Sequence, residues 1–346
     1  MAADEASALV SVAIVELDVN GDVMVTWSYP GVDDEYEKVI MARSRLKDAA
    51  APGAGFSRHR NQWHYWATAA AGLPSAALEK VHGFAVHVAA TPYNPERYGA
   101  LAASLVRAYL ATGEPTKVLE GYLKAFTTGR TSDGWAAAEH DAKMALVSNT
   151  ALHVLPTIFG QEVVLIWNAM LLKKRVLVFC ERTDDLLRVV RALPQLVWHR
   201  QDWGILRPLL TGSPEELADL AEAGVYVAGV TSPEWRARTD LYDLFVDVAG
   251  RSVEVAEAAK ADFALGPFHR DVAGVLVAAA AAEGANAMSV IKGIAVKTKE
   301  LVTQVRSLGE ADGGVTMAGI RAKGLPEATQ RFVYATAVAE GLTKSA

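Results

Sequence analysis

The densest group of polar and aromatic side chains in the 346-residue sequence is Trp198-His-Arg-Gln-Asp-Trp203. Tryptophan and arginine carry much of the energy of protein interfaces, so His199, Arg200, Asp202 and Trp203 could bind a protein partner. The alternative is that the tryptophans pack in a core and the polar residues satisfy nearby backbone, because buried polar groups are usually hydrogen-bonded. Packing is the commoner role, and we carry both interpretations forward.

A second aromatic pair, Trp27 and Tyr29, lies at the end of a predicted hairpin, in the run Trp27-Ser-Tyr-Pro30. These side chains could stack within their own domain or contact a partner. The pair is therefore a second candidate for a protein-binding surface.

The motifs of covalent catalysis and of cofactor binding are missing from the sequence. There is no Walker A lysine motif and no Gly-x-Ser-x-Gly elbow, and Phe56 follows Gly55 where a dinucleotide fingerprint would need a different pattern. His59 and His64 are five residues apart, which is not the four-residue spacing of a zinc-binding helix, and His82 and His87 have the same spacing. We therefore expect no catalytic site, no metal and no cofactor, and no enzyme of covalent chemistry.

The composition indicates a globular protein with enough apolar residues to bury a core. Hydrophobic residues make up 51% of the chain and the net charge is −6, which argues against a basic nucleic-acid-binding face. The single cysteine, Cys180, excludes an internal disulfide. The N-terminus lacks the pattern of a signal peptide, and no apolar run is long enough to span a bilayer. We expect a cytoplasmic protein that reaches membranes only through a partner.

Residues 162–230 alternate between helical and strand patterns, which favours an α/β core. A helix over 162–172 ends in three basic residues, and residues 176–180 and 225–230 are short apolar runs typical of buried strands. A helix starting at Thr183 or Asp184 is ended or kinked by Pro194. Ser213-Pro-Glu-Glu216 predicts a helix start in which Ser213 is the N-cap and Glu216 closes a capping box.

The N-terminal third predicts a small sheet with helices. Strands over 9–17 and 23–27 flank Asn20-Gly21, the favoured pair of a type I′ turn, in which both residues have positive φ. A helix over 33–46, a loop over 52–55, strands over 62–68 and 81–89 joined across 72–74, and two helices starting at Pro95 and Pro115 follow. The pattern alone is α+β.

The remaining segments complete the predicted domain order. Residues 127–140 are polar and contain glycine, which makes them the best boundary candidate. A helix around 148–159 ends at Gly160, residues 244–248 and 251–255 form a second hairpin, and the chain from 255 onward is helical with a glycine-rich break at 312–314.

Residues 193–206, with Leu-Pro-x-Leu-Val-Trp and a second tryptophan five residues on, resemble the central part of a DENN module. Residues 170–176, 240–246 and the hairpin around Asn20-Gly21 support this resemblance, which covers nearly the whole chain. It implies a bilobed α/β protein: a longin-like α+β lobe (1–128, uDENN-like), a linker (129–140), a central α/β lobe (141–256, cDENN-like) and a helical C-terminal part (257–346, dDENN-like).

The resemblance also implies a function, that of a guanine-nucleotide exchange factor for a Rab GTPase in late endosomal trafficking. Nucleotide exchange breaks no covalent bond, so the missing catalytic motifs agree with it. The alternative is a non-catalytic DENN scaffold bound to coiled-coil subunits of an endosomal cargo-retrieval complex. Under either alternative, we expect the protein on late endosomes through its partners, without inserting into the membrane or binding nucleic acid.

Overall fold

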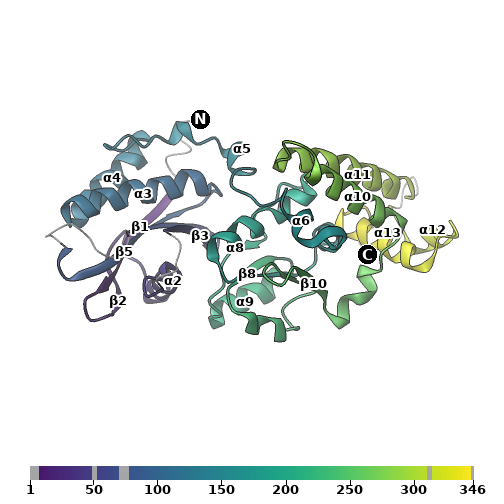
Figure 1. Ribbon diagram of the computed structural model, residues 1–346, viewed down its shortest axis with the longest axis horizontal. Helices are drawn as coiled ribbons and strands as arrows, with labels where there is room; N and C mark the ends of the chain where they lie inside the picture. Colours follow the sequence, from purple (N-terminus) through teal and green to yellow (C-terminus); the bar gives the residue numbers. More distant parts are fainter. Residues whose placement is uncertain (1–7, 49–52, 70–77, 310–313, 344–346) are drawn as a thin grey trace. The chain divides into compact units, whose positions relative to one another are not determined.

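The computed structural model describes residues 8–48, 53–69, 78–309 and 314–343 and divides the chain into two compact units (Figure 1). Unit 1 comprises Met1–Ser148, Arg182–Leu187 and Pro208–Glu216. Unit 2 comprises Asn149–Glu181, Arg188–Arg207 and Leu217–Ala346.

Unit 1 contains a five-stranded antiparallel sheet with the strand order β2-β1-β5-β4-β3. The strands are β1 (Leu9–Asp18), β2 (Val23–Tyr29), β3 (Ala54–His59), β4 (Gln62–Ala69) and β5 (Val81–Ala90). Helix α2 (Asp34–Ser44) packs on one face, whereas α3 (Pro95–Thr112) and α4 (Pro115–Thr128) lie on the other (Figure 1). Successive residues of β5 show the two faces: Ala85 packs in the α2 core, and Phe84 contacts Tyr109 of α3.

The first hairpin forms at the predicted position, but its turn is not the predicted one. Gly21 N–H donates to the Asp18 carbonyl, and Gly21 has φ +86°. Asn20 is not among the residues with positive φ, so the prediction of a type I′ turn is wrong. The Asp18 carboxylate instead accepts the N–H groups of Asn20 and Asp22 and organises the loop from one side.

Strand β3 was not predicted, because its glycine and polar residues favoured a loop over 52–55. Ala54 and Gly55 belong to the strand, which corrects that prediction, and residue 52 lies outside the described residues. Gly55 pairs with Trp66, and a Cβ atom at Gly55 would come within 2.3 Å of the indole ring. The glycine therefore makes room for a fully buried tryptophan. The connection predicted across 72–74 also lies outside the described residues.

The helix signals of unit 1 are confirmed. The Asp33 side chain accepts the Tyr36 N–H at the start of α2, and Asn94 accepts the Arg97 N–H at the start of α3. Gly113 ends α3 with φ +68°.

Residues 129–148 pack on unit 1 and are not an open connection. Asp133 accepts hydrogen bonds from Ser104 and Arg107 of α3, and the buried Trp135 donates to the Arg97 carbonyl at 3.1 Å. Two short elements follow, η2 (Ala137–Glu139) and α5 (Ala142–Ala145). Unit 1 thus runs on to Ser148, whereas the sequence placed a linker at 129–140.

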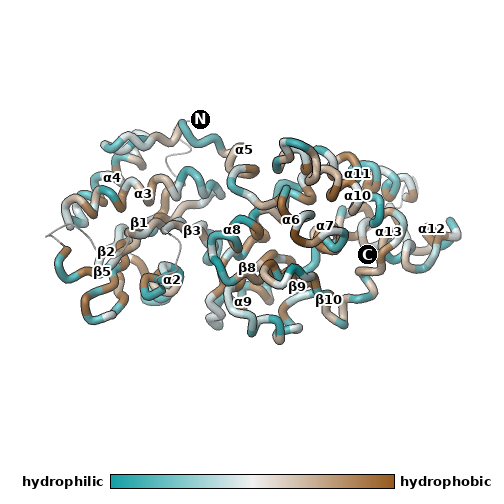
Figure 2. The backbone as a smooth tube through the Cα atoms, viewed as in Figure 1, coloured by the Kyte–Doolittle hydropathy of each residue, from teal (hydrophilic) through white to brown (hydrophobic). Residues whose placement is uncertain are grey.

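Unit 2 contains a second five-stranded sheet with the strand order β10-β9-β6-β8-β7. Its strands are β6 (Val176–Phe179), β7 (Leu206–Arg207), β8 (Val227–Val230), β9 (Leu244–Asp247) and β10 (Ser252–Val255). β7, β8, β6 and β9 are parallel, and β10 returns antiparallel to β9. The predicted strands and the second hairpin are confirmed, and the two-residue strand β7 was missed. Helix α7 (Val163–Leu171), brown over much of its length in Figure 2, is buried at eight of its positions.

The helices beside this sheet begin as expected, with one difference at Glu216. α8 (Thr183–Val190) is followed by the 3-10 helix η4 (Leu193–Val197), which contains Pro194, and α9 (Pro214–Ala223) begins after Ser213. Ser213 accepts the Glu216 N–H at 3.3 Å, as in a capping box. The Glu216 carboxylate does not close the box on Ser213, because it accepts the N–H groups of Thr211 and Gly212.

The C-terminal part is helical, as predicted. Its long helices are α10 (Pro267–Ala281), α11 (Ala287–Ser307) and α13 (Glu327–Ala339), with α12 (Met317–Arg321) and the 3-10 helix η6 (Glu257–Phe263). Another 3-10 helix, η5 (Pro233–Ala237), lies earlier in the chain, between β8 and β9. Of the helix predicted around 148–159, α6 (Leu155–Phe159) is formed, followed by η3 (Gly160–Glu162). The glycine-rich break begins at residues that lie outside the described ones.

Candidate protein-binding site

A β-bulge in β2 directs Trp27 and Tyr29 to the α4 face of the unit 1 sheet. The pairing register moves from Val15↔Val25 to Ile14↔Trp27, so Thr26 is an extra residue in β2. Before the bulge, Val25 packs against the core on the α2 side. Because side chains alternate along a strand, Trp27 and Tyr29 would face α2 as well if the bulge were absent. One inserted residue therefore decides which face carries the aromatic pair.

Tyr29 is the more exposed residue of this pair and adjoins α4. Its ring meets the buried Tyr122 ring edge-on, with centroids 6.2 Å apart. Leu123 and Phe126 of α4 are 38% and 37% exposed, and Tyr29 is 41% exposed. Phe126 lies one helical turn from both Tyr122 and Leu123, so these exposed residues of α4 are neighbours of the helix position that Tyr29 contacts. Tyr29, Leu123 and Phe126 are here called the β2–α4 patch. Burial raises the pKa of Tyr122 to about 12, which keeps the phenol protonated beneath it.

Trp27 stands beside this patch and is half-buried. It pairs across the sheet with Ile14 and shares the α4 face with Tyr29. The structure thus brings the first predicted aromatic pair together on one strand face of unit 1, and its partner-binding role stays a prediction.

The second predicted cluster lies in unit 2, where Trp203 is buried and Trp198 half-buried. Their rings meet edge-on with centroids 5.9 Å apart. Trp203 is 5% exposed, which agrees with the packing alternative for this residue. Asp202 is exposed and accepts the Gly204 N–H at 2.8 Å, which is a local turn contact.

Arg200 and His199 are paired inside unit 2. The Arg200 guanidinium donates to the carbonyls of Met170 and Leu171 at 2.8 and 2.7 Å, where α7 ends. It also pairs with Glu340, which accepts a 3.0 Å hydrogen bond from His199 as well. Burial alone would raise the pKa of Glu340, but the hydrogen bond from His199 and the charge of Arg200 lower it to about 2. These contacts join the ends of α7 and α13, and binding of Arg200 to a partner stays a prediction.

Unit 1 contains a buried polar cluster that no local sequence signal indicated. The Tyr36 hydroxyl is 2.6 Å from Nδ1 of His64, and the His59 and His64 rings are 6.1 Å apart. These histidines lie on neighbouring strands of the β3–β4 hairpin, where His59 pairs with Gln62 and His64 with Ser57, so the test of helical spacing could not detect them. Burial lowers the pKa of both histidines and raises the pKa of Tyr36, so this cluster is uncharged at neutral pH.

A buried ion pair lies near this cluster and was also missed. Arg43 of α2 donates to Glu216 at 2.9 Å and to the Arg58 carbonyl at 3.0 Å. The two charged residues are 2% and 6% exposed. They are 173 positions apart in the sequence, so no local pattern could have paired them.

Among the residues that the structure describes, there is no group of three or more His, Cys, Asp or Glu side chains placed to hold a metal ion. None of the described helices is both long enough and apolar enough to cross a membrane.

Comparison with known proteins first identifies the class of protein. Residues 149–257 match the family described as SPA, stabilization of polarity axis, and this match begins where unit 2 begins. The two sheets and their helices form a mixed α/β structure that is consistent with a DENN-type fold.

Relatives that match almost the whole chain then give the family. The chain is 35% identical to DENN domain-containing protein 10 of Dictyostelium discoideum, covering 96% of this chain and 97% of the relative. It is 34% identical to the Danio rerio protein of that name (97% and 98% covered) and 32% identical to the Homo sapiens one (97% and 97%). The chain belongs to the DENN domain-containing protein 10 family.

Proposed function

We propose that this protein is a guanine-nucleotide exchange factor for a Rab GTPase. The observation that carries the proposal is the similarity to DENN domain-containing protein 10 along almost the entire chain. DENN domains are commonly associated with Rab exchange, and the family relation therefore makes a Rab the first partner to test.

The proposed mechanism requires no covalent step. An exchange factor binds the nucleotide-free GTPase more tightly than the loaded one, and linkage then lowers nucleotide affinity by the same factor. The switch loops of a GTPase are held by phosphate and Mg²⁺ contacts, so a protein surface that stabilises another loop conformation promotes release of both.

The β2–α4 patch is the surface that we propose for the Rab. Exposed aromatic and aliphatic residues that lie together are typical of interaction sites, and Tyr29 and Phe126 could serve as anchors. The patch stands on a strand and a helix, and such elements hold anchors more rigidly than loops do. Trp27 beside it would support the position of Tyr29.

The finer architecture and location belong to the same proposal. Unit 1 would correspond to the longin-like lobe, the sheet of unit 2 to the central lobe, and α10 to α13 to the helical part. Through its Rab or another partner, the protein would act on the surface of late endosomes.

The test is nucleotide release from a panel of Rab proteins loaded with fluorescent GDP. The protein should accelerate release from one of them and bind its nucleotide-free form more tightly than its GDP-loaded form. Replacing both patch anchors in Tyr29→Ser/Phe126→Ser should weaken Rab binding by at least about 1 kcal/mol, roughly fivefold. Val338→Ser, which changes a 53% exposed residue of unit 2, is the control. No acceleration with any Rab would contradict the exchange activity.

A scaffold role is the second candidate, and exposed apolar residues on α11 favour it. Met288 and Val296 are 39% and 57% exposed, and their eight-residue separation places them on one side of the helix. A coiled-coil partner could pack against such a face. The scaffold would be favoured over the exchange factor if the protein co-purified stoichiometrically with coiled-coil proteins and was inactive toward every Rab. The double variant Met288→Ser/Val296→Ser should then lose the co-purification.

A further inference from the structure

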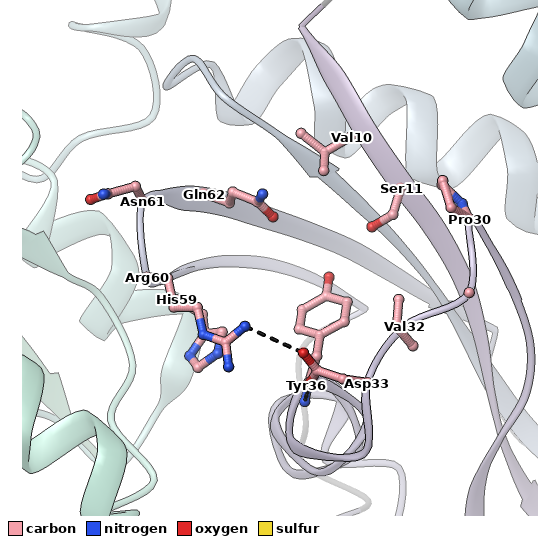
Figure 3. Close-up of a pocket in the computed structure, with 11 residues that line it drawn as sticks. Val10, Ser11, Pro30, Val32, Asp33, Tyr36, His59, Arg60, Asn61 and Gln62 are labelled. Atoms are coloured by element: carbon pink, nitrogen blue, oxygen red, sulfur yellow. Dashed lines mark hydrogen bonds and ion pairs between the residues drawn. The ribbon is translucent and has the colours of Figure 1, made fainter.

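Unit 1 contains a pocket of about 390 Å³ between the start of β1, the loop before α2 and the β3–β4 turn (Figure 3). This volume lies within the usual range of small-ligand sites, roughly 300–1,000 Å³. Val10, Val32 and Pro30 supply apolar surface along its walls. The pocket is separate from the β2–α4 patch, because its lining includes none of the three patch residues.

The floor of the pocket carries hydrogen-bond acceptors. Figure 3 shows the Tyr36 hydroxyl pointing between Ser11 and Gln62. The Tyr36 hydroxyl is 2.6 Å from Nδ1 of His64, and the Tyr36 oxygen accepts a hydrogen bond from the buried Ser11 hydroxyl. Because Ser11 uses its hydrogen toward Tyr36, the Ser11 oxygen is left as an acceptor for a ligand.

His59 supplies a ring nitrogen that lacks a partner. Its side chain lines the pocket and is only 9% exposed, and its Nε2 atom is buried without a hydrogen bond. Burial, and then the charges of Arg43 and Arg60, lower the pKa of His59, so the neutral ring can accept a proton donor. A buried polar atom without a partner is costly, and a donor from a ligand would satisfy it.

The rim of the pocket is acidic overall. Asp33 lines the pocket, and Glu35 lies two positions further along the chain, in the first turn of α2. Arg60 is 57% exposed at its side chain and pairs with both, at 3.4 Å to Asp33 and 2.6 Å to Glu35. Two carboxylates against one guanidinium leave one negative charge. The Arg60 guanidinium already pairs with these carboxylates, which indicates that they can bind a guanidinium group.

We propose that this pocket binds a guanidinium group, carried by a small arginine-like molecule or by an arginine side chain of a peptide. The group would donate to the Ser11 oxygen and to the His59 ring, and would pair with Asp33. Displacement of Arg60 from Asp33 would free that carboxylate for the ligand.

Shape and charge favour this group over other ligands. An anion would meet acceptors and carboxylates, which repel it. The Tyr36 and His59 rings lie within 23° of parallel, and planar cations stack on such aromatic faces. Guanidinium has five N–H donors in a plane, whereas ammonium is compact and more strongly hydrated. The site therefore suits guanidinium better than lysine.

The experiment is titration of the full-length protein with N-acetyl-argininamide, followed by calorimetry and NMR. The neutral isostere N-acetyl-citrullinamide should bind at least about tenfold more weakly, because it lacks the charge. Asp33→Asn should weaken arginine binding about fivefold or more while the asparagine still caps α2. A blocked Gly-Arg-Gly peptide distinguishes the two sources: equal affinity indicates recognition of the group alone, and tighter binding indicates a displayed side chain.

Two variants separate ligand binding from a structural effect. Asp141→Asn makes the same change at the N-cap of α5, outside the pocket, and should leave the affinity unchanged. Arg60→Gly removes the competing cation at a position with φ +53°, where glycine is well tolerated, and should tighten arginine binding severalfold. The proposal is overturned if the arginine ligand does not saturate the protein, if citrulline binds equally well, or if Arg60→Gly weakens binding. No Rab enters this test, so its outcome is independent of the exchange activity.

Discussion

The buried ion pair between Arg43 and Glu216 gives the sharpest prediction about stability. Both side chains are almost completely buried, at 2% and 6% exposed, and their charged atoms are 2.9 Å apart. Glu216→Ala would leave the Arg43 guanidinium buried without its counter-charge. Removing one partner of such a pair typically costs about 3–5 kcal/mol, because the remaining charge keeps its desolvation penalty.

The same variant removes further contacts of the carboxylate. Glu216 also accepts hydrogen bonds from the Thr211 N–H at 2.7 Å, the Thr211 hydroxyl at 2.9 Å and the Gly212 N–H at 2.9 Å. These groups are only partly buried, so water can replace much of what they lose. We therefore expect the free energy of unfolding to fall by about 3–5 kcal/mol, set mainly by the charge. For a unit of this size, the melting temperature should fall by roughly 6–20 °C.

Urea unfolding followed by circular dichroism measures this loss, with melting as a second assay. Arg43→Met/Glu216→Leu is the informative companion, because replacing a whole buried pair by apolar residues is often nearly neutral. The double variant should recover most of the stability that Glu216→Ala loses. A loss below about 1 kcal/mol in Glu216→Ala, or a double variant that is just as unstable, would refute the assignment of the penalty to an unpaired buried charge.

Three further predictions test the packing and protonation of the two units. Gly55→Ala should lower the free energy of unfolding by about 1–3 kcal/mol, because the new Cβ would meet the Trp66 ring at 2.3 Å. Gly53→Ala should be nearly neutral in the same denaturation assay, because a Cβ at Gly53 would have no atom within 4 Å. Burial and then the charge of Arg43 lower the pKa of His87 from 6.5 to about 3. As the pH falls, the unfolded chain therefore binds a proton at this histidine before the folded chain does, and the free energy of unfolding should fall between pH 6.5 and 3. His87→Phe should flatten that part of the pH–stability curve. The pKa of Glu340 is lowered from 4.5 to about 2, so its contribution is present above pH 4.5 and lost as the pH falls toward 2, and Glu340→Gln should show no such loss in acid titrations.

Local signals in the sequence were sufficient for most helices and for the central strands. Asp33, Asn94 and Gly113 begin or end helices where they were expected, because capping depends on neighbours within three or four residues. The parallel strands β6 and β8 were recognisable for a similar reason, since strands buried on both faces are continuously apolar.

Strand β3 and the bulge in β2 could not be predicted, because both depend on residues across the sheet. Gly55 is favourable in β3 only because Trp66 lies opposite it, and a glycine considered alone indicates a loop. The bulge at Thr26 has no marker in its own residue type, yet it determines the face on which Tyr29 stands.

The candidate sites were harder to predict because their partners are distant in the sequence. Arg200 was selected as a partner-binding residue for its residue type, but Glu340, which pairs with it, is 140 positions away. Ser11 was not considered and His59 was considered only as a metal ligand, since only the sheet brings their strands to one pocket.

The internal contacts of the two predicted clusters also decide which is the better candidate for a partner surface. A residue that is already paired must give up that pair before it can bind elsewhere, and the cost is subtracted from the affinity. Arg200 would have to leave Glu340 and two carbonyls at the end of α7. Tyr29 would lose little, because its exposed part faces solvent while its edge contact with Tyr122 holds the ring in place. Binding at Tyr29 therefore gains from preorganisation, whereas binding at Arg200 would first require the ends of α7 and α13 to lose their connection.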